Sequence, residues 1–366
     1  MGQRAPCINS AELRHFHPIP CGESTTPCGG CGPGAPCHTS SVRLAIFVPL
    51  AIAATAQAHP PRHDPSPVPI HTHERGDFWR DAVEPHADEV RRIVERARVT
   101  IQQADASLTG DYDPSGEQRA KFYGDAYGML RYAHKLAPDS VEVLFLLGAT
   151  ADELGKTRQA KDALEDAVRI AGAERAGADV TGRLGAIYLR LGRLDDAIHY
   201  LRIAQGTAQP ATSAAMARDA VMLATALALH GDTNDAIDVL SNLAPPNVGY
   251  YTNELALISF ALAVQYDRDD QRSAAREVLD RMQSAMQPSQ FAAQVQVGLA
   301  SIRWAPPEDR HYYQALLYES MGHYTEARAE WALYADVADL PYRARALDHV
   351  AAIDAARRAP HVKAAP

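Results

Sequence analysis

A spaced pattern of small and large residues recurs along the chain, and it constrains the fold more than any other feature. In its clearest copy, Gly185 is followed by Tyr188, Gly192, Ala197 and Leu201 at fixed offsets. Four further copies begin at small residues: Gly148, Ala224, Ala263 and Ala315. Glycine inside a helix costs about 1 kcal/mol relative to alanine. Its recurrence in a helical sequence therefore predicts places where two helix backbones approach closely.

The spacing within each copy predicts two helices joined by a tight turn. Gly192 lies between the two halves, where a left-handed backbone conformation ends a helix without steric strain. A single helical hairpin cannot bury its apolar face, so neighbouring hairpins must stack on one another. Alanine is abundant and runs of β-branched residues are scarce, which also favours helices. The sequence therefore predicts an all-α solenoid of stacked hairpins.

The pattern resembles the tetratricopeptide repeat, whose signature is Leu-Gly-x2-Tyr followed by Ala-x3-Phe. Leu184-Gly185-x2-Tyr188 matches the first half, and Ala197-x3-Leu201 matches the second with leucine in place of phenylalanine. The resemblance implies a right-handed superhelix. The positions that carry the repeat signature are Gly148, Ala160, Gly185, Tyr188, Ala197, Ala236, Ala275, Tyr318 and Ala327.

The resemblance covers roughly residues 117–340, within a solenoid expected over residues 77–358 and followed by a tail at 359–366. The copies begin 37, 39, 39 and 52 residues apart. The widest gap predicts an inserted helix, Ser289 to Arg303. A further helix is expected ahead of the repeats, and a capping helix at 341–358. The clear repeats are predicted at 141–172, 178–207, 217–244, 256–286 and 308–340.

Composition and motifs exclude several classes of function. The formal net charge is -9 and no stripe of Lys or Arg occurs, which disfavours nucleic-acid binding. No run of 18 apolar residues exists, so no transmembrane helix is expected in the mature chain. The motifs of serine hydrolases, zinc proteases, phosphate-binding loops and dinucleotide sites are all missing from the sequence. We therefore expect a protein that is not an enzyme and that uses no cofactor.

An export signal is predicted near the N-terminus. Leu44 to Ala56 is a short apolar run preceded by Arg43, and Ala56-Gln57-Ala58 forms a small-x-small cleavage box. Residues 42–58 are thus expected to be a signal peptide, which predicts a periplasmic or extracellular protein. A signal that begins so far into the chain suggests translation from Val42 instead of Met1. The leader at 1–41 would then not be translated.

Residues 59–76 are rich in proline and histidine and are predicted to form an extended tether. His59, His71 and His73 could supply ligands for copper or zinc, so a metal-handling protein is the alternative to an interaction module. A disordered tether does not preorganise ligands, which favours the tether interpretation. Cys28-x2-Cys31 resembles half of a zinc site but lacks a partner pair at the required spacing.

A near match to a calcium loop occurs at Asp111, Asp113, Ser115 and Gly116. The glutamate that should follow as a bidentate ligand is replaced by Phe122. A plain turn between two helices explains Gly116 equally well, and the sequence does not decide whether calcium binds.

The resemblance also implies a binding surface, because the first helix of each repeat lines a concave groove in this family. We expect a peptide or protein segment to bind there, with apolar character and basic flanks, gripped mainly by Phe145, Phe260 and Tyr312. The predicted function is a non-enzymatic adaptor or scaffold of the cell envelope. The predicted groove residues are Glu142, Phe145, Asp152, Leu189, Arg218, Val221, Phe260, Val264, Asp267, Tyr312 and Glu319.

Overall fold

The computed structural model describes residues 85–106, 116–207, 213–244 and 250–358. Within these ranges every regular element is a helix and none is a strand. The helices are α2 (Ala87–Ala106), α3 (Glu117–Leu136), α4 (Val141–Glu153), α5 (Thr157–Ala171), α6 (Ala173–Ala176), α7 (Ala178–Arg190), α8 (Leu194–Thr207), α9 (Ala214–His230), α10 (Thr233–Leu243), α11 (Asn253–Arg268), α12 (Arg272–Ala285), α13 (Pro288–Ala300), α14 (Asp309–Ser320), α15 (Tyr324–Asp336) and α16 (Arg343–Arg358).

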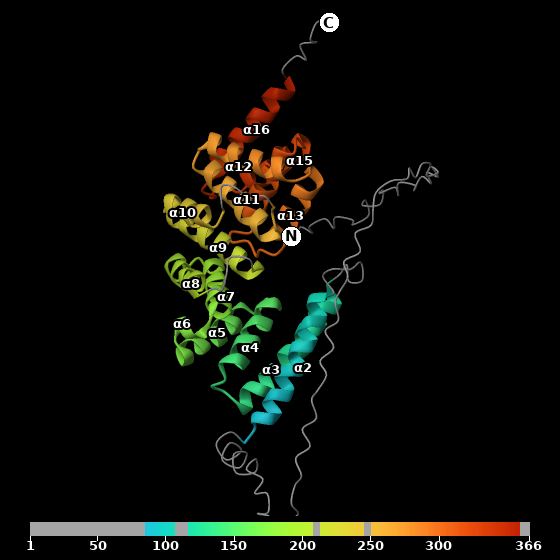
Figure 1. Ribbon diagram of the computed structural model, residues 1–366, viewed down its shortest axis with the longest axis vertical. Coiled ribbons are helices and arrows are strands. Elements are labelled where there is room, and N and C mark those ends of the chain that lie inside the picture. The colour runs from blue at the N-terminus through green and yellow to red at the C-terminus, as the bar shows by residue number, and fades with distance from the viewer. Residues whose placement is uncertain (1–84, 107–115, 208–212, 245–249, 359–366) are drawn as a thin grey trace, which may run out of the picture. The chain divides into compact units, whose positions relative to one another are not determined.

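Consecutive helices pack as hairpins, and each hairpin packs on the next. The hairpins pair α2 with α3, α4 with α5, α7 with α8, α9 with α10, α11 with α12 and α14 with α15. Neighbouring hairpins meet through α3 and α4, α5 and α7, α7 and α9, and α9 and α11. Figure 1 shows the described helices following one another in chain order. The predicted all-α solenoid is confirmed, including the extra helix α2, the inserted helix α13 and the terminal helix α16.

Small residues allow close contact within a hairpin, as the sequence pattern predicted. A Cβ atom on Gly148 of α4 would lie 2.7 Å from Cγ of Leu164 on α5. The same atom on Gly185 of α7 would lie 2.6 Å from Cγ of Leu201 and 3.1 Å from its backbone nitrogen. Gly192 has a φ of 70° and ends α7 at the turn into α8. The repeated glycines are therefore a packing requirement of the hairpin.

The two helices of a hairpin differ in how much surface they bury. On α9, every residue from Met216 to Ala228 is buried except Arg218. Helix α5 buries one stripe, at Ala160, Ala163, Leu164 and Ala167, which matches a helix covered on one side only. The first helices are thus enclosed by the second helices and by their neighbours. Hydroxyl caps fix where three of them begin, as at Ser213, which accepts a hydrogen bond from the Met216 backbone nitrogen at 3.1 Å.

Candidate functional site

The first helices α4, α7, α9, α11 and α14 form what we call the inner surface, and α13 covers part of it. Helix α13 packs on α11, where a Cβ on Gly298 would lie 2.8 Å from Cβ of Leu257. The ring of Phe291 on α13 lies 6.4 Å from that of Phe260, edge to face. Phe260 and Val264 are 0% exposed. Their prediction as groove residues is therefore corrected: the chain's own inserted helix already occupies that face.

Tyr312 also belongs to the core and not to an open groove. Its ring packs edge-on against Trp331 at 4.7 Å and Tyr334 at 5.1 Å, and its hydroxyl donates a hydrogen bond to Asp267 Oδ2 at 2.7 Å. It is 0% exposed. The prediction that Tyr312 grips a guest is corrected, because residues of α15 enclose its ring. Leu189 and Val221 are likewise buried, so these two predicted groove residues contribute packing within the repeats.

A bridge of charged residues joins the segment after α13 to α4 and α7. Arg303, which follows α13, donates to the carbonyl oxygen of Asp152 and to Glu153 Oε2, each at 2.6 Å. The Asp152 carboxylate is buried and pairs with Arg183 and Arg190 of α7. Asp152 was predicted to face a guest and is instead neutralised by the protein. No local sequence signal identifies Arg303, because its partners lie 150 residues away or more.

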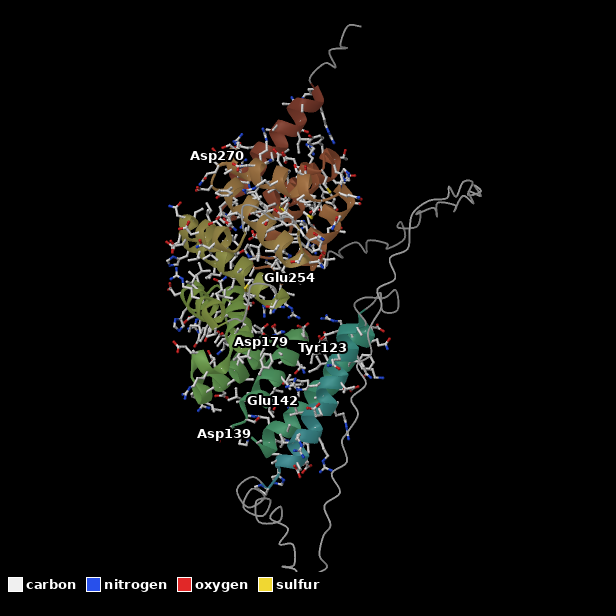
Figure 2. All side chains as sticks on the ribbon, in the orientation of Figure 1. Tyr123, Asp139, Glu142, Asp179, Glu254 and Asp270 are labelled. Carbon is white, nitrogen blue, oxygen red and sulfur yellow. The ribbon has the colours of Figure 1, made fainter. Side chains whose placement is uncertain are left out.

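An open pocket of about 580 Å³ remains at the other end of the inner surface, over the first turns of α4, α7 and α9. Its apolar lining includes Phe145, Val180 and Met216. Its charged lining residues are Glu142, Asp179 and Asp219, and the described lining holds no lysine or arginine. Figure 2 marks Glu142 and Asp179 on α4 and α7. The predicted groove residues Glu142 and Phe145 thus lie at an acidic, partly apolar pocket.

Asp219 is the unusual member of this pocket, because its carboxyl group is buried without a hydrogen bond to Oδ1. The residue is 5% exposed, and the nearest cation, Nε of Arg218, is 3.8 Å from Oδ1. Burial raises the pKa of Asp219 to about 7, although Arg218 opposes this shift. The carboxyl group sits against Gly182 of α7, where a Cβ would lie 2.1 Å from Oδ2. Sequence reasoning selected Arg218 and missed Asp219.

Comparison with known families identifies the repeat. Residues 141–174, which contain the α4–α5 hairpin, match the family model described as tetratricopeptide repeat. The chain therefore contains a tetratricopeptide repeat. The matched segment includes Glu142, Phe145, Gly148 and Ala160, so it carries one wall of the acidic pocket and one tight helix crossing. No curated protein matches the chain in a sequence comparison.

Several solved structures of tetratricopeptide repeat type are similar to the chain. One is titled as the functional characterisation of Pseudomonas aeruginosa pilF, with 14% identity, a TM-score of 0.41, and coverage of 70% of this chain and 99% of that one. Another is YrrB, titled a TPR protein with an unusual peptide-binding site, with 17% identity, a TM-score of 0.38, and coverage of 54% and 90%. A third is a putative kinesin light chain of Podospora anserina, with 16% identity, a TM-score of 0.44, and coverage of 58% and 98%.

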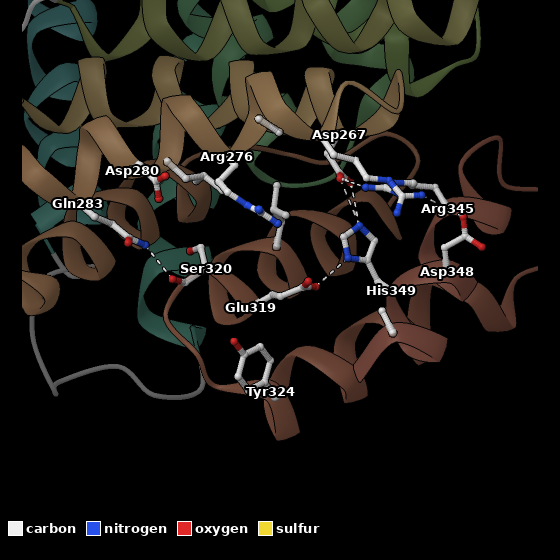
Figure 3. Close-up of a pocket in the computed structure, with 15 residues that line it drawn as sticks. Asp267, Arg276, Asp280, Gln283, Glu319, Ser320, Tyr324, Arg345, Asp348 and His349 are labelled. Atoms are coloured by element: carbon white, nitrogen blue, oxygen red, sulfur yellow. Dashed lines mark hydrogen bonds and ion pairs between the residues drawn. The ribbon is translucent and has the colours of Figure 1, made fainter. Parts of the chain in front are cut away.

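Helices α11, α14 and α16 hold a second cluster of charges, shown in Figure 3. His349 of α16 places Nε2 3.1 Å from Asp267 Oδ2 and Nδ1 2.8 Å from Glu319 Oε2. Trp331 stacks on the His349 ring and donates its indole N–H to Glu319 at 2.7 Å. Arg345 pairs with Asp267 from the same helix. The predicted groove residues Asp267 and Glu319 therefore bind the terminal helix of the repeat protein itself.

The pKa values of this cluster follow from its pairing. Burial alone would lower the pKa of His349, but its hydrogen bonds to Asp267 and Glu319 outweigh burial and raise the pKa to about 9. Burial would raise the pKa of Asp267, yet the hydrogen bonds from His349 and Arg345 hold it well below its ordinary value. A pocket of about 390 Å³ adjoins these groups. Because each of these charges has a partner on another helix, the cluster joins α16 to α11 and α14.

Several predicted features lie outside the residues that the structure describes. They are the leader and signal peptide, the tether histidines His59, His71 and His73, and most of the Asp111–Gly116 segment. The described ranges contain no group of three His, Cys, Asp or Glu side chains that could hold a metal ion. Within the same ranges, no helix combines the length and the apolar character needed to cross a bilayer.

Proposed function

We propose that this tetratricopeptide repeat protein is a non-enzymatic adaptor that binds a segment of a partner protein in the acidic pocket of α4, α7 and α9. The observation that carries the proposal is the open pocket of about 580 Å³, which combines apolar side chains with three carboxylates. Peptide-binding sites commonly join an apolar anchor to a few charged groups that fix orientation. Phe145 is the anchor in this proposal, because it is only partly buried and lies beside Glu142.

The remainder of the inner surface has a different role in the proposal. Helix α13 and Arg303 already cover the faces of α11 and reach α4, so a partner segment would contact α4, α7 and α9 only. This restricts the partner to a short segment of a few residues instead of a long extended peptide. The net charge of -9 further favours a partner with basic character.

Affinity capture with the full chain, using proteins solubilised from the native cell envelope, tests the proposal. The matched variants are Phe145→Ala, in the pocket, and Leu333→Ala, which removes a half-exposed apolar side chain from α15. We expect the wild type and Leu333→Ala to retain the same partner, and Phe145→Ala to lose it. Equal retention by all three proteins would contradict the assignment of the pocket.

The proposed place of action is outside the cytoplasm, in the cell envelope. Its support is the apolar run Leu44 to Ala56 with Arg43 before it and the Ala56-Gln57-Ala58 box after it. N-terminal sequencing of the protein from fractionated cells tests this directly. A mature chain that begins at His59 in the envelope fraction is expected, and an intact chain in the cytoplasmic fraction would contradict export.

A further inference from the structure

The buried carboxylate of Asp219 has a geometry that the packing of the repeats does not require. Its Oδ1 is buried and accepts no hydrogen bond, whereas buried polar groups in proteins are almost always paired. The three residues that follow Asp219 on α9, namely Ala220, Val221 and Met222, are all apolar and buried. A buried acid without a hydrogen-bond partner costs stability, so its position needs an explanation beyond folding.

The neighbouring helix leaves a space that matches this carboxylate. Gly182 of α7 faces Asp219, and a Cβ there would lie 2.1 Å from Oδ2, so a side chain at this position would displace the carboxylate. The carboxylate therefore sits in a slot between α7 and α9, at the floor of the pocket that Phe145 and Glu142 also line. The slot is a built feature of two helices and not a chance arrangement of surface acids.

The charges around the slot favour a positively charged guest. Asp179 on α7 and Glu142 on α4 line the same pocket and are exposed to solvent. On the far side of Asp219, Arg218 of α9 and Arg183 of α7 line a separate small pocket together with Asp152 and Arg303. Arg183 is paired with Asp152 there, and Arg218 Nε stays 3.8 Å from Asp219. On the side that opens to the larger pocket, the lining acids besides Asp219 are Asp179 and Glu142, and Glu142 is already paired with Arg98 of α2 at 2.6 Å.

We propose that the slot at Asp219 binds the cationic side chain of a lysine or arginine in the partner segment, while Phe145 contacts an apolar residue beside it. This inference rests on the proposed function and specifies the chemistry of its ligand. A charge-assisted hydrogen bond from the guest would pair the Asp219 carboxylate, and Asp179, which lines the same pocket, would attract the cation. The specificity would then be for a basic residue next to an apolar one.

Binding should depend on pH, because the slot attracts a cation only when Asp219 is ionised. Burial raises the pKa of Asp219 to about 7, Arg218 and Arg183 oppose the shift, and Asp179 adds to it. Glu142 of α4 is the remaining charged group that lines the pocket, and it is paired with Arg98 of α2. Affinity is therefore expected to increase as the pH rises from 6 to 8.

The probe is a phage-displayed library of random nine-residue peptides, selected on the full chain at pH 8. We expect selected peptides to share a lysine or arginine at one position beside an apolar residue. The best peptide is then measured by calorimetry, together with a copy in which citrulline or acetyl-lysine replaces the basic residue. The wild type should lose about 10- to 100-fold in affinity on that replacement, the range of a charge-assisted hydrogen bond.

The variant Asp219→Asn keeps the shape of the slot and removes its charge, and Asp195→Asn changes an exposed aspartate on α8 as the matched control. Asp219→Asn should bind the basic and neutral peptides almost equally, and should lose the increase in affinity between pH 6 and 8. The control should behave as the wild type. Thermal unfolding establishes that both variants are folded.

The outcomes separate the two proposals. A library that yields no binder would overturn the proposed function itself. Binders that are sensitive to Phe145→Ala but carry no basic residue would keep that function and overturn the cation slot. If Asp219→Asn still prefers the basic peptide over the neutral copy as the wild type does, the cation slot would likewise be overturned and the proposed function kept. A dimer at pH 8 that Asp219→Asn abolishes in sedimentation would assign the slot to a second copy of this chain and overturn the partner assignment.

Discussion

The imidazole of His349 lies 3.1 Å from the carboxylate of Asp267, although 82 residues separate them in the chain. The contact joins α16 to the end of α11, and Glu319 of α14 holds the other ring nitrogen at 2.8 Å. One histidine thus connects the terminal helix to two successive repeats. Such an arrangement makes the stability of the C-terminal repeats sensitive to the protonation of a single ring.

The free energy of unfolding is expected to depend on pH because His349 titrates. Its pKa is about 9 in the folded protein against 6.5 in the unfolded chain, so the pairing contributes fully below pH 6.5 and is lost as the pH rises through 9. A pKa raised by this amount contributes about 3 kcal/mol to the free energy of unfolding. Chemical unfolding of the wild type and of His349→Gln at pH 6.5 and 9.5 measures the contribution of this pairing to the free energy of unfolding. The difference between the two proteins should shrink at pH 9.5, and a constant difference would contradict this account.

Asp219 is expected to destabilise the free protein above neutral pH. Its folded pKa of about 7 exceeds the ordinary 3.8, so stability is lost as the pH rises from about 4 to 7. The full shift corresponds to about 4 kcal/mol for this buried group. Asp219→Asn should therefore unfold at a higher denaturant concentration than the wild type at pH 8, with a smaller gap at pH 5. A variant less stable than the wild type at pH 8 would show that the carboxylate is a structural requirement.

The glycine pattern gives a prediction with a control inside the same protein. Gly185→Ala places a Cβ 2.6 Å from Leu201 Cγ and 3.1 Å from its backbone nitrogen, which cannot easily move. We expect a loss of about 1–3 kcal/mol in the free energy of unfolding, as for other overpacked cores. Gly128→Ala on α3 meets nothing within 4 Å and should gain about 0.5–1 kcal/mol from helix propensity. Denaturant titrations of both variants measure these changes in the free energy of unfolding. A loss of stability in Gly128→Ala would contradict the explanation.

The repeats could be predicted from the sequence because their cause is local and periodic. Gly148 and Gly185 mark close helix contacts, and the offsets from each to the next small residue define a hairpin. The wide gap after the fourth copy likewise predicted that α13 exists. These features depend on residues within about one repeat of each other, so one sequence is enough to read them.

The binding surface could be predicted only in part, because its accessibility depends on long-range contacts. Family resemblance placed Phe145 and Phe260 on equivalent faces, yet α13 covers Phe260 and leaves Phe145 beside an open pocket. Nothing in the order of residues says where an inserted helix will fold back. The pairing of Arg303 with Glu153 could not be predicted either, because 150 residues separate the two in the chain. Asp219 was missed because a buried acid is recognised by its surroundings and not by a motif.

The buried ion pair between Arg268 and Asp309 offers a last test of how the C-terminal repeats are held together. Both side chains are 0% exposed, with Nη2 of Arg268 2.9 Å from Oδ1 of Asp309. The guanidinium also lies 4.5–4.7 Å from the ring centres of Tyr312 and Tyr342. Asp309→Asn removes the buried anion that pairs with this cation and should cost about 3–5 kcal/mol in the free energy of unfolding.

The double variant Arg268→Met with Asp309→Leu separates the charge from the packing. Replacing a buried pair by apolar residues of similar volume is often neutral, because the desolvation of both ions disappears with their attraction. We therefore expect the double variant to recover most of the stability that Asp309→Asn loses, measured by denaturant unfolding at pH 7. If the double variant is instead less stable than Asp309→Asn, the contacts of Arg268 with the tyrosine rings contribute more than the ion pair does.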